Sequence, residues 1–337
     1  MLNRRLKDAE EAVRSTFRGA LIVLGVCLAG VELAPRPGVH AQAVPTAIAV
    51  FNGGLIEYST DFGVTWHKST GTIPSGSAGN LRRVSCPDAT DCWTVAPFGV
   101  ILVSHDAGRI WARQASPVTT NLKGVSFSDR MHGLISGQEG VILTTSNEGA
   151  TWVKRSSGLS ATLYNAALPA PGIGYVVGDN GVIAKTADGG ATWHRQSSGV
   201  GSLLDGVSFV NSTHGVAVGE NQTILTTSNG GATWTARSNP ATNKLYGVST
   251  PDASHWYAAG ISNIVASSDG GHTWHLQASA SPGKLLAIAF PRGDPLHGIA
   301  HGYDGLTVTT STGGATAWQP RKSNTTLEGY GLGFTTD

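Results

Sequence analysis

An octapeptide that ends in tryptophan recurs along this 337-residue chain and constrains its architecture more than any other feature. Six copies follow the pattern S/T-x-D/N-x-G-x-x-W, and their last residues are Trp66, Trp111, Trp152, Trp193, Trp234 and Trp274. A seventh copy, TSTGGATAW, has one extra residue before Trp318 and carries Thr312 where the others have Asp or Asn. Because the tryptophans are 40 to 45 residues apart, the chain is one structural unit repeated around seven times.

Each unit contains a second recurring pattern upstream of the octapeptide. LKGVSF (122–127) is followed by HGLISGQEG and VILTTS, and LLDGVSF (203–209) is followed by HGVAVGENQ and TILTTS. Alternating runs bounded by Gly, Asn and Asp are typical of strands and hairpins. Four antiparallel strands in a unit of about 41 residues are typical of a β-propeller blade, whereas β-helix repeats are much shorter. We therefore predict an all-β, seven-bladed propeller as a single domain over residues 44–337.

The blade count indicates how the ring closes. The first octapeptide is preceded by only two runs, so the first blade lacks its first strand. The segment TLEGYGLGF (326–334) has the pattern of a first strand, and no second run follows it. We expect this C-terminal strand to pair beside residues 46–52, which removes the open edges of the terminal blade.

The octapeptide is interpreted as a folding device. An Asp or Asn side chain can accept hydrogen bonds from N–H groups one and two residues ahead, and the Gly two residues on permits a positive φ. The Trp then packs between neighbouring blades, for about 2–3 kcal/mol. Copies in different blades point outward around a ring, so they cannot form one catalytic site. The predicted turn-forming residues are Asp61, Asp106, Asn147, Asp188, Asn229 and Asp269.

The N-terminus differs from the rest of the chain. Basic residues precede the apolar run GALIVLGVCLAGV (19–31), and Ala41 and Ala43 form an A-x-A cleavage signature. This order is typical of a secretory signal peptide, which we place at residues 1–43; an uncleaved anchor is the alternative. The prediction is an exported protein, periplasmic, extracytoplasmic or secreted.

Cysteine and histidine usage favours structure over metal chemistry. After residue 43 only Cys86 and Cys92 remain, and in an exported chain this spacing predicts a local disulfide. His132, His214 and His297 occur at the same place in three non-adjacent units, which indicates a turn role. We expect no metal and no cofactor. A formal charge of +1 does not indicate nucleic-acid binding.

The octapeptide resembles the Asp-box, or bacterial neuraminidase (BNR) repeat, of sialidase-type propellers. A glycoside hydrolase is therefore the main alternative. Sialidases usually carry an Arg-Ile-Pro motif on the first blade and use a Tyr–Glu pair as nucleophile, whereas this sequence has no such motif and only five Glu after residue 43. Acidic residues recur in the turn between the second and third strands, where they could form an acidic ring but fit ordinary hairpin turns. They are Glu139, Asp179, Glu220 and Asp304.

The wider repeat, best represented by VGDNGVIAKTADGGATWHRQSSG (177–199), resembles the photosystem II stability and assembly factors and their relatives in non-photosynthetic bacteria. The resemblance implies an exported, non-catalytic propeller that binds a protein or membrane-protein assembly. We expect a monomer. In that family binding is tied to arginines. The arginines that correspond here lie in residues 67–118, the segment least like the repeat. Tolerated drift of its long loop is the alternative interpretation of that segment. The candidate partner-binding residues are Arg82, Arg83, Arg109 and Arg113. A carbohydrate-active or carbohydrate-binding propeller is the alternative.

Overall fold

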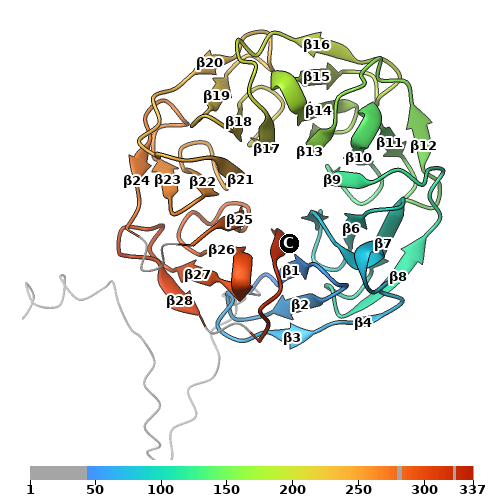
Figure 1. Ribbon diagram of the computed structural model, residues 1–337, viewed down its shortest axis with the longest axis horizontal. Helices are drawn as coiled ribbons and strands as arrows, with labels where there is room; N and C mark the ends of the chain where they lie inside the picture. The colour runs from blue at the N-terminus through green and yellow to red at the C-terminus, as the bar shows by residue number, and fades with distance from the viewer. Residues whose placement is uncertain (1–43, 279–282, 322–323, 337) are drawn as a thin grey trace, which may run out of the picture. The chain divides into compact units, whose positions relative to one another are not determined.

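The computed structural model describes residues 44–278, 283–321 and 324–336. The predicted signal peptide lies outside these residues. These residues form one compact unit, a closed ring of seven blades around a central channel, each built on a four-stranded antiparallel sheet to which blade 2 adds a fifth strand (Figure 1). The predicted seven-bladed propeller is therefore confirmed. We number the blades 1 to 7 along the chain from residue 44.

Within each blade the strands run outward from the channel. The innermost strands of blades 1 to 7 are β29 (Gly329–Phe334), β5 (Val84–Ser85), β9 (Leu122–Phe127), β13 (Leu163–Ala170), β17 (Leu204–Phe209), β21 (Leu245–Ser249) and β25 (Leu285–Ala289). The second strands are β1 (Ala47–Phe51), β6 (Cys92–Ala96), β10 (Gly133–Gly137), β14 (Ile173–Gly178), β18 (Gly215–Gly219), β22 (Trp256–Gly260) and β26 (Gly298–Gly302).

In every blade except the second, the two outer strands are shorter than the two inner ones. The third strands are β2 (Ile56–Ser59), β7 (Val100–Ser104), β11 (Ile142–Thr145), β15 (Ile183–Thr186), β19 (Ile224–Thr227), β23 (Ile264–Ser267) and β27 (Thr307–Thr310). The outermost strands are β3 (His67–Lys68), β8 (Ile110–Gln114), β12 (Val153–Arg155), β16 (His194–Gln196), β20 (Thr235–Ala236), β24 (His275–Leu276) and β28 (Gln319–Arg321). Four short 3₁₀ turns complete the described elements: η1 (Ser77–Gly79), η2 (Gln138–Gly140), η3 (Asp179–Gly181) and η4 (Tyr303–Gly305).

The C-terminal strand closes the ring as predicted. β29 pairs antiparallel with β1, with Leu332 opposite Ala49 and Phe334 opposite Ala47. The side chains of Leu332 and Phe334 are buried with residues of blades 1 and 7. The first blade therefore combines the two ends of the described chain, and every blade has its innermost strand among the described residues.

The core lies between blades. Each of the seven apolar clusters joins residues of two neighbouring blades and contains or contacts an octapeptide tryptophan. Trp93 stacks on Phe127 of the next blade at 3.8 Å between ring centroids, and Trp152 meets the same ring edge-on at 5.8 Å. Burial of a large aromatic ring contributes about 2–3 kcal/mol.

In the six regular octapeptides the Asp or Asn Oδ1 accepts a hydrogen bond from the N–H four residues ahead, and blade 4 illustrates the turn. Asp188 Oδ1 accepts from the Thr192 N–H at 2.9 Å, and the Thr192 hydroxyl donates to Oδ2 at 2.6 Å. The acceptor thus bonds four residues ahead, not one and two as expected from the sequence. These hydrogen bonds from Thr192 hold the pKa of the Asp188 carboxyl well below its usual range. In the seventh copy, in blade 7, the Thr312 hydroxyl replaces the carboxylate and accepts a hydrogen bond from the Thr316 N–H at 3.2 Å.

The segment around residues 69–80 gives blade 2 an extra edge. β4 (Thr70–Gly71) pairs parallel with β8, which makes this the one five-stranded sheet among the described strands. Cys86 and Cys92 form the predicted disulfide across the turn that joins β5 to β6. The extra strand and the disulfide, which the described parts of the other repeats lack, therefore reinforce the structure of blade 2.

Candidate functional site

The two ends of the channel differ, and the strand directions define them. The innermost strands all begin on one side, here the proximal face, and end on the other, the distal face. The turns between second and third strands lie on the proximal face: Gln138 N–H donates to the Asn121 carbonyl and Glu220 N–H to the Leu203 carbonyl, both at 2.9 Å. The octapeptide turns, between third and fourth strands, lie on the distal face.

One position in each blade lines the opening of the channel on the proximal face. It follows the first buried residue of the innermost strand, and its side chain points to the channel because successive residues alternate across a strand. The seven residues are Tyr330, Arg82, Lys123, Tyr164, Asp205, Tyr246 and Leu286. Together with Arg83, Lys284 and Tyr303 they line a cavity of about 190 Å³, which we call the cationic mouth.

The next position along the same strands is usually glycine, since neighbouring innermost strands approach closely there. A Cβ on Gly124 would lie 2.7 Å from Asn165 Cα, and a Cβ on Gly331 would lie 2.8 Å from Arg83 Cα. Blade 2 has Arg83 at this position, and its side chain extends across the channel.

The Arg83 guanidinium binds four blades at once. Nη1 donates to the carbonyls of Leu286 (3.3 Å) and Tyr330 (3.1 Å), and Nη2 donates to those of Asp205 (3.3 Å) and Tyr246 (3.1 Å). Burial lowers its pKa, which the nearby Asp205 carboxylate partly opposes; an arginine nevertheless stays charged at neutral pH. Arg83 thus forms the floor of the cationic mouth.

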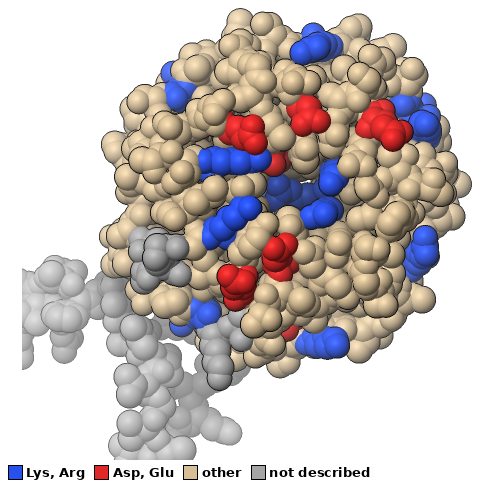
Figure 2. Space-filling view, in the orientation of Figure 1, with Lys and Arg blue, Asp and Glu red and all other residues tan. Residues whose placement is uncertain are grey.

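Cations of the mouth lie against tyrosine rings. Arg82 lies over the Tyr330 ring at 4.4 Å, and Lys284 lies 4.1 Å from the centroid of Tyr303 and 5.1 Å from that of Tyr246. Cation–π contacts of this kind hold a charged group over an aromatic face without neutralising it. Figure 2 shows basic side chains gathered around the central opening and acidic side chains outside them.

Three of these cations lack a carboxylate partner. Lys244, beside the mouth, pairs with Asp205 at 2.7 Å and with Glu220 at 3.2 Å. Within the described residues, however, no ion pair involves Arg82, Lys123 or Lys284. Burial, followed by repulsion from Arg82, lowers the pKa of Lys123. The mouth therefore holds uncompensated positive charge in a partly desolvated space, which favours an anionic ligand.

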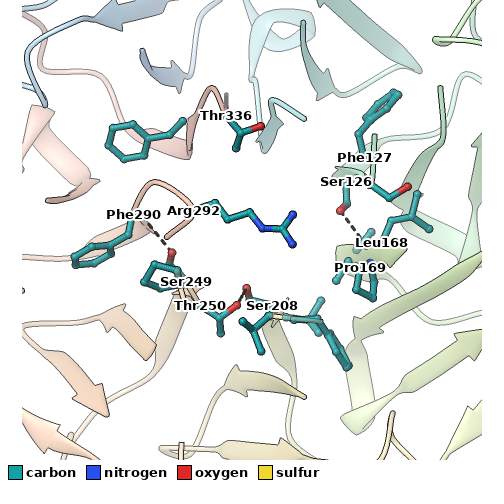
Figure 3. Close-up of a pocket in the computed structure, with 18 residues that line it drawn as sticks. Ser126, Phe127, Leu168, Pro169, Ser208, Ser249, Thr250, Phe290, Arg292 and Thr336 are labelled. Atoms are coloured by element: carbon teal, nitrogen blue, oxygen red, sulfur yellow. Dashed lines mark hydrogen bonds between the residues drawn. The ribbon is translucent and has the colours of Figure 1, made fainter. Parts of the chain in front are cut away.

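The distal end of the channel has a different chemistry. A cavity of about 290 Å³ is lined by serines, threonines and apolar residues from the ends of the innermost strands, with Arg292 as its one charged lining residue (Figure 3). Several of its hydroxyls bind the neighbouring strand: Ser126 Oγ accepts from Leu168 N–H at 2.9 Å, and Ser249 Oγ from Phe290 N–H at 3.2 Å. These groups connect the blades.

The structure separates the four candidate arginines. Arg82 and Arg83 lie in the cationic mouth. Arg109 lies in the octapeptide turn of blade 2, where it donates to the Asp106 carbonyl at 2.7 Å and lies 5.2 Å from the Tyr58 ring. Arg113 is exposed on the outermost strand β8. Sequence proximity thus brings together only the first pair.

The other candidate groups occupy turns. His132 and His297 each bind the Asp three residues earlier through Nδ1, at 3.0 and 2.8 Å, which fits the expected turn role. The acidic residues Glu139, Asp179, Glu220 and Asp304 all lie in second-to-third-strand turns on the proximal face. The described residues contain no cluster of His, Cys, Asp and Glu that could hold a metal ion, and no helix among them is long and apolar enough to cross a membrane.

Sequence reasoning missed most of the mouth. Lys123, Lys284 and the four tyrosines were not singled out, because the alternation that aims them at the channel becomes informative only once the blades are superimposed. The usable signal was the residue before Gly in LKG (122–124), LDG (204–206), LYG (245–247) and GYG (329–331). When the seven repeats are aligned, the residue at this position in each repeat is the one that lines the channel.

The fold and the mouth define a class: a closed β-propeller with a charged and aromatic cavity at one end of its channel. The sequence profile of the photosynthesis system II assembly factor YCF48 family matches residues 42–146 and 197–276, more than half of the chain. The chain belongs to that family.

Solved structures agree on the fold. YCF48 bound to D1 peptide has a TM-score of 0.61 at 15% identity, over 90% of this chain and 100% of that one. YCF48 from Cyanidioschyzon merolae has a TM-score of 0.60 at 19% identity, over 78% and 97% of the two chains. The WD40 propeller domain of Doa1 reaches 0.61 at 12% identity, over 76% and 86%. Among curated proteins, none matches this chain.

Proposed function

We propose that this protein is a non-catalytic scaffold that binds an anionic segment of a partner protein at the cationic mouth. The observation that carries the proposal is the convergence of Arg82, Lys123 and Lys284, without ion-pair partners among the described residues, on one cavity lined by tyrosines. Arginine and tyrosine are the residue types that dominate protein-binding hot spots. A family relative, YCF48, is known with D1 peptide bound, which supports a peptide as the ligand.

The geometry of the mouth favours surface binding over threading. Arg83 crosses the channel directly beneath the mouth and donates to carbonyls of four blades. A partner segment that enters from the proximal face therefore meets a positively charged floor. We propose that it lies across the mouth and directs one or more carboxylates inward.

The binding test uses fluorescein-labelled nine-residue peptides of Gly and Ser that contain three Asp, three Asn or three Lys. Fluorescence anisotropy should show binding of the Asp peptide alone, weakened by added salt. The double variant Arg82→Glu, Lys123→Glu should lose at least about tenfold in affinity. Lys154→Glu, Arg195→Glu changes the net charge equally on exposed outer strands and should stay within about twofold.

Two results would contradict the proposal. Equal affinity for the Asn and Asp peptides would show that the ligand need not be anionic. Equal losses of affinity in the two double variants would show that the mouth is not the binding site. Glycan binding at the mouth, or turnover of any fluorogenic glycoside, would instead favour the carbohydrate reading.

Export is a separate part of the proposal: we propose that the protein meets its partner outside the cytoplasm. Its support is the order of basic, apolar and A-x-A segments in residues 1–43. The check is cell fractionation combined with mass spectrometry of the mature N-terminus. A full-length protein that stays in the cytoplasm would overturn this part alone.

A further inference from the structure

Phe98 occupies a turn where the other blades carry glycine or a polar residue. The tip of the second-to-third-strand turn has a left-handed backbone in every blade, with φ between 53° and 73°. The residues at this tip in blades 1 to 7 are Gly53, Phe98, Glu139, Asn180, Asn221, Ser262 and Asp304. Glycine, asparagine and aspartate adopt this conformation readily, whereas a bulky aromatic residue rarely does.

The Phe98 side chain is also exposed. Its residue keeps 53% of its surface accessible at φ 59°, although the preceding Pro97 is buried. Folding therefore gains little from an aromatic ring here, and the backbone conformation disfavours it. Strained residues that the fold does not require are concentrated at binding sites.

The turn that carries Phe98 is tied to the cationic mouth. Phe98 N–H donates to Asn121 Oδ1 at 3.1 Å, and Gly99 N–H donates to the Thr120 carbonyl at 2.9 Å. Asn121 is two residues before Lys123, so its Cα lies within about 7 Å of the Lys123 Cα along extended chain. Phe98 thus lies on the proximal face, on the side of the mouth formed by blades 2 and 3.

We propose that Phe98 is an aromatic anchor that extends the cationic mouth into a bipartite docking surface. This inference rests on the proposed peptide binding and specifies its ligand: a segment with carboxylates for the mouth and one apolar side chain for Phe98. Since an extended peptide advances about 3.3 Å per residue, the apolar residue lies about two to four positions from the nearest acidic one. The positive charge of the mouth is the reason to expect carboxylates in the ligand, and the exposed Phe98 ring is the reason to expect an apolar side chain.

The test compares the three-Asp peptide with a version in which the Gly three positions from the nearest Asp is replaced by Leu. Wild-type protein should bind the Leu peptide about fivefold more tightly. Phe98→Asn restores a residue type found at this tip in blades 4 and 5. It should erase the preference for the Leu peptide and leave the affinity for the plain Asp peptide within about twofold.

Two controls separate anchoring from folding. Asn at position 98 relieves the left-handed strain and loses the contacts of a half-exposed ring, so the melting temperature should stay within about 3 °C of wild type. Leu296→Asn removes an apolar residue of similar exposure, 50%, from a turn that joins first and second strands on the distal face, and should keep the Leu preference.

The outcomes distinguish the two proposals. If wild type binds both peptides equally, or if Phe98→Asn retains the Leu preference, the anchor is overturned and anionic binding stands. If neither peptide binds wild-type protein, both proposals are wrong.

Discussion

Nη2 of Arg83, on blade 2, donates a 3.1 Å hydrogen bond to the backbone carbonyl of Tyr246, on blade 6, across the central channel. Together with its bonds to blades 1, 5 and 7, this contact joins five of the seven blades through one side chain. A residue immediately before the two-residue strand β5 thereby stabilises the ring as a whole.

Arg83→Met should destabilise the protein by about 2–3 kcal/mol, because it removes four hydrogen bonds from a charged donor and leaves their carbonyls to be satisfied by water. Arg83→Lys retains the charge with fewer donors and should lose roughly half as much. Urea denaturation of each variant measures the difference. Arg82→Met is the matched control and should cost under about 1 kcal/mol, since it loses one partly exposed cation–π contact. Equal losses of unfolding free energy in Arg82→Met and Arg83→Met would refute the conclusion that the Arg83 hydrogen bonds stabilise the ring.

His301 should make stability depend on pH. It is buried beside Phe51, whose ring centroid is 5.2 Å away, and against Gly329 of the closing strand. Burial lowers the pKa of His301 to about 4, below the unfolded value near 6.5. The unfolded chain therefore binds the proton more tightly than the folded protein does.

Neutral His301 therefore contributes its full share to the free energy of unfolding above about pH 6.5. This contribution, about 3 kcal/mol in total, is lost as the pH falls towards 4 and below, because protonation then favours the unfolded chain. The free energy of unfolding, measured by urea denaturation at several pH values, checks this. His301→Gln cannot titrate, so its profile should be flatter between pH 6.5 and 4. A variant profile parallel to that of wild type would assign the loss to other groups.

Removal of residues 328–337 should strongly destabilise the ring. It deletes β29 with the buried side chains of Leu332 and Phe334, each worth about 2–5 kcal/mol, and exposes the edge of β1. It also removes Thr336, whose hydroxyl donates to the Pro87 carbonyl in the disulfide loop at 2.6 Å. A fall in melting temperature of about 10 °C or more is expected. A truncated protein that melts with the full chain would exclude closure through β29.

The sequence was sufficient for the ring and its closure because both follow from local periodicity. The octapeptide marks each blade, and an unmatched first strand at residues 326–334 implies the pairing with β1. The disulfide likewise joins cysteines within one turn. Such features need no knowledge of how distant blades face one another.

The mouth could not be predicted in the same way. Arg82 and Arg83 are adjacent, yet one lies over Tyr330 and the other binds carbonyls of four blades, which depends on the diameter and registry of the closed ring. Arg109 is near them in sequence but separated by two strands of the same blade. The unusual turn at Phe98 was equally invisible, because APFG reads as an ordinary hairpin turn until its φ is known.

One octapeptide turn should be improvable. Ala107 has φ 58° at the position where four other blades carry Gly189, Gly230, Gly270 and Gly313. A non-glycine residue pays about 1–2 kcal/mol in this conformation, while loss of one buried methyl costs about 0.8 kcal/mol. Ala107→Gly should therefore stabilise the protein by roughly 0.5–1 kcal/mol, measured as a shift of the urea midpoint. Ala258→Gly, in the buried strand β22, should have the opposite effect, because a strand glycine loses packing and gains no conformational relief. A loss of stability in Ala107→Gly would mean that the turn tolerates its alanine without strain.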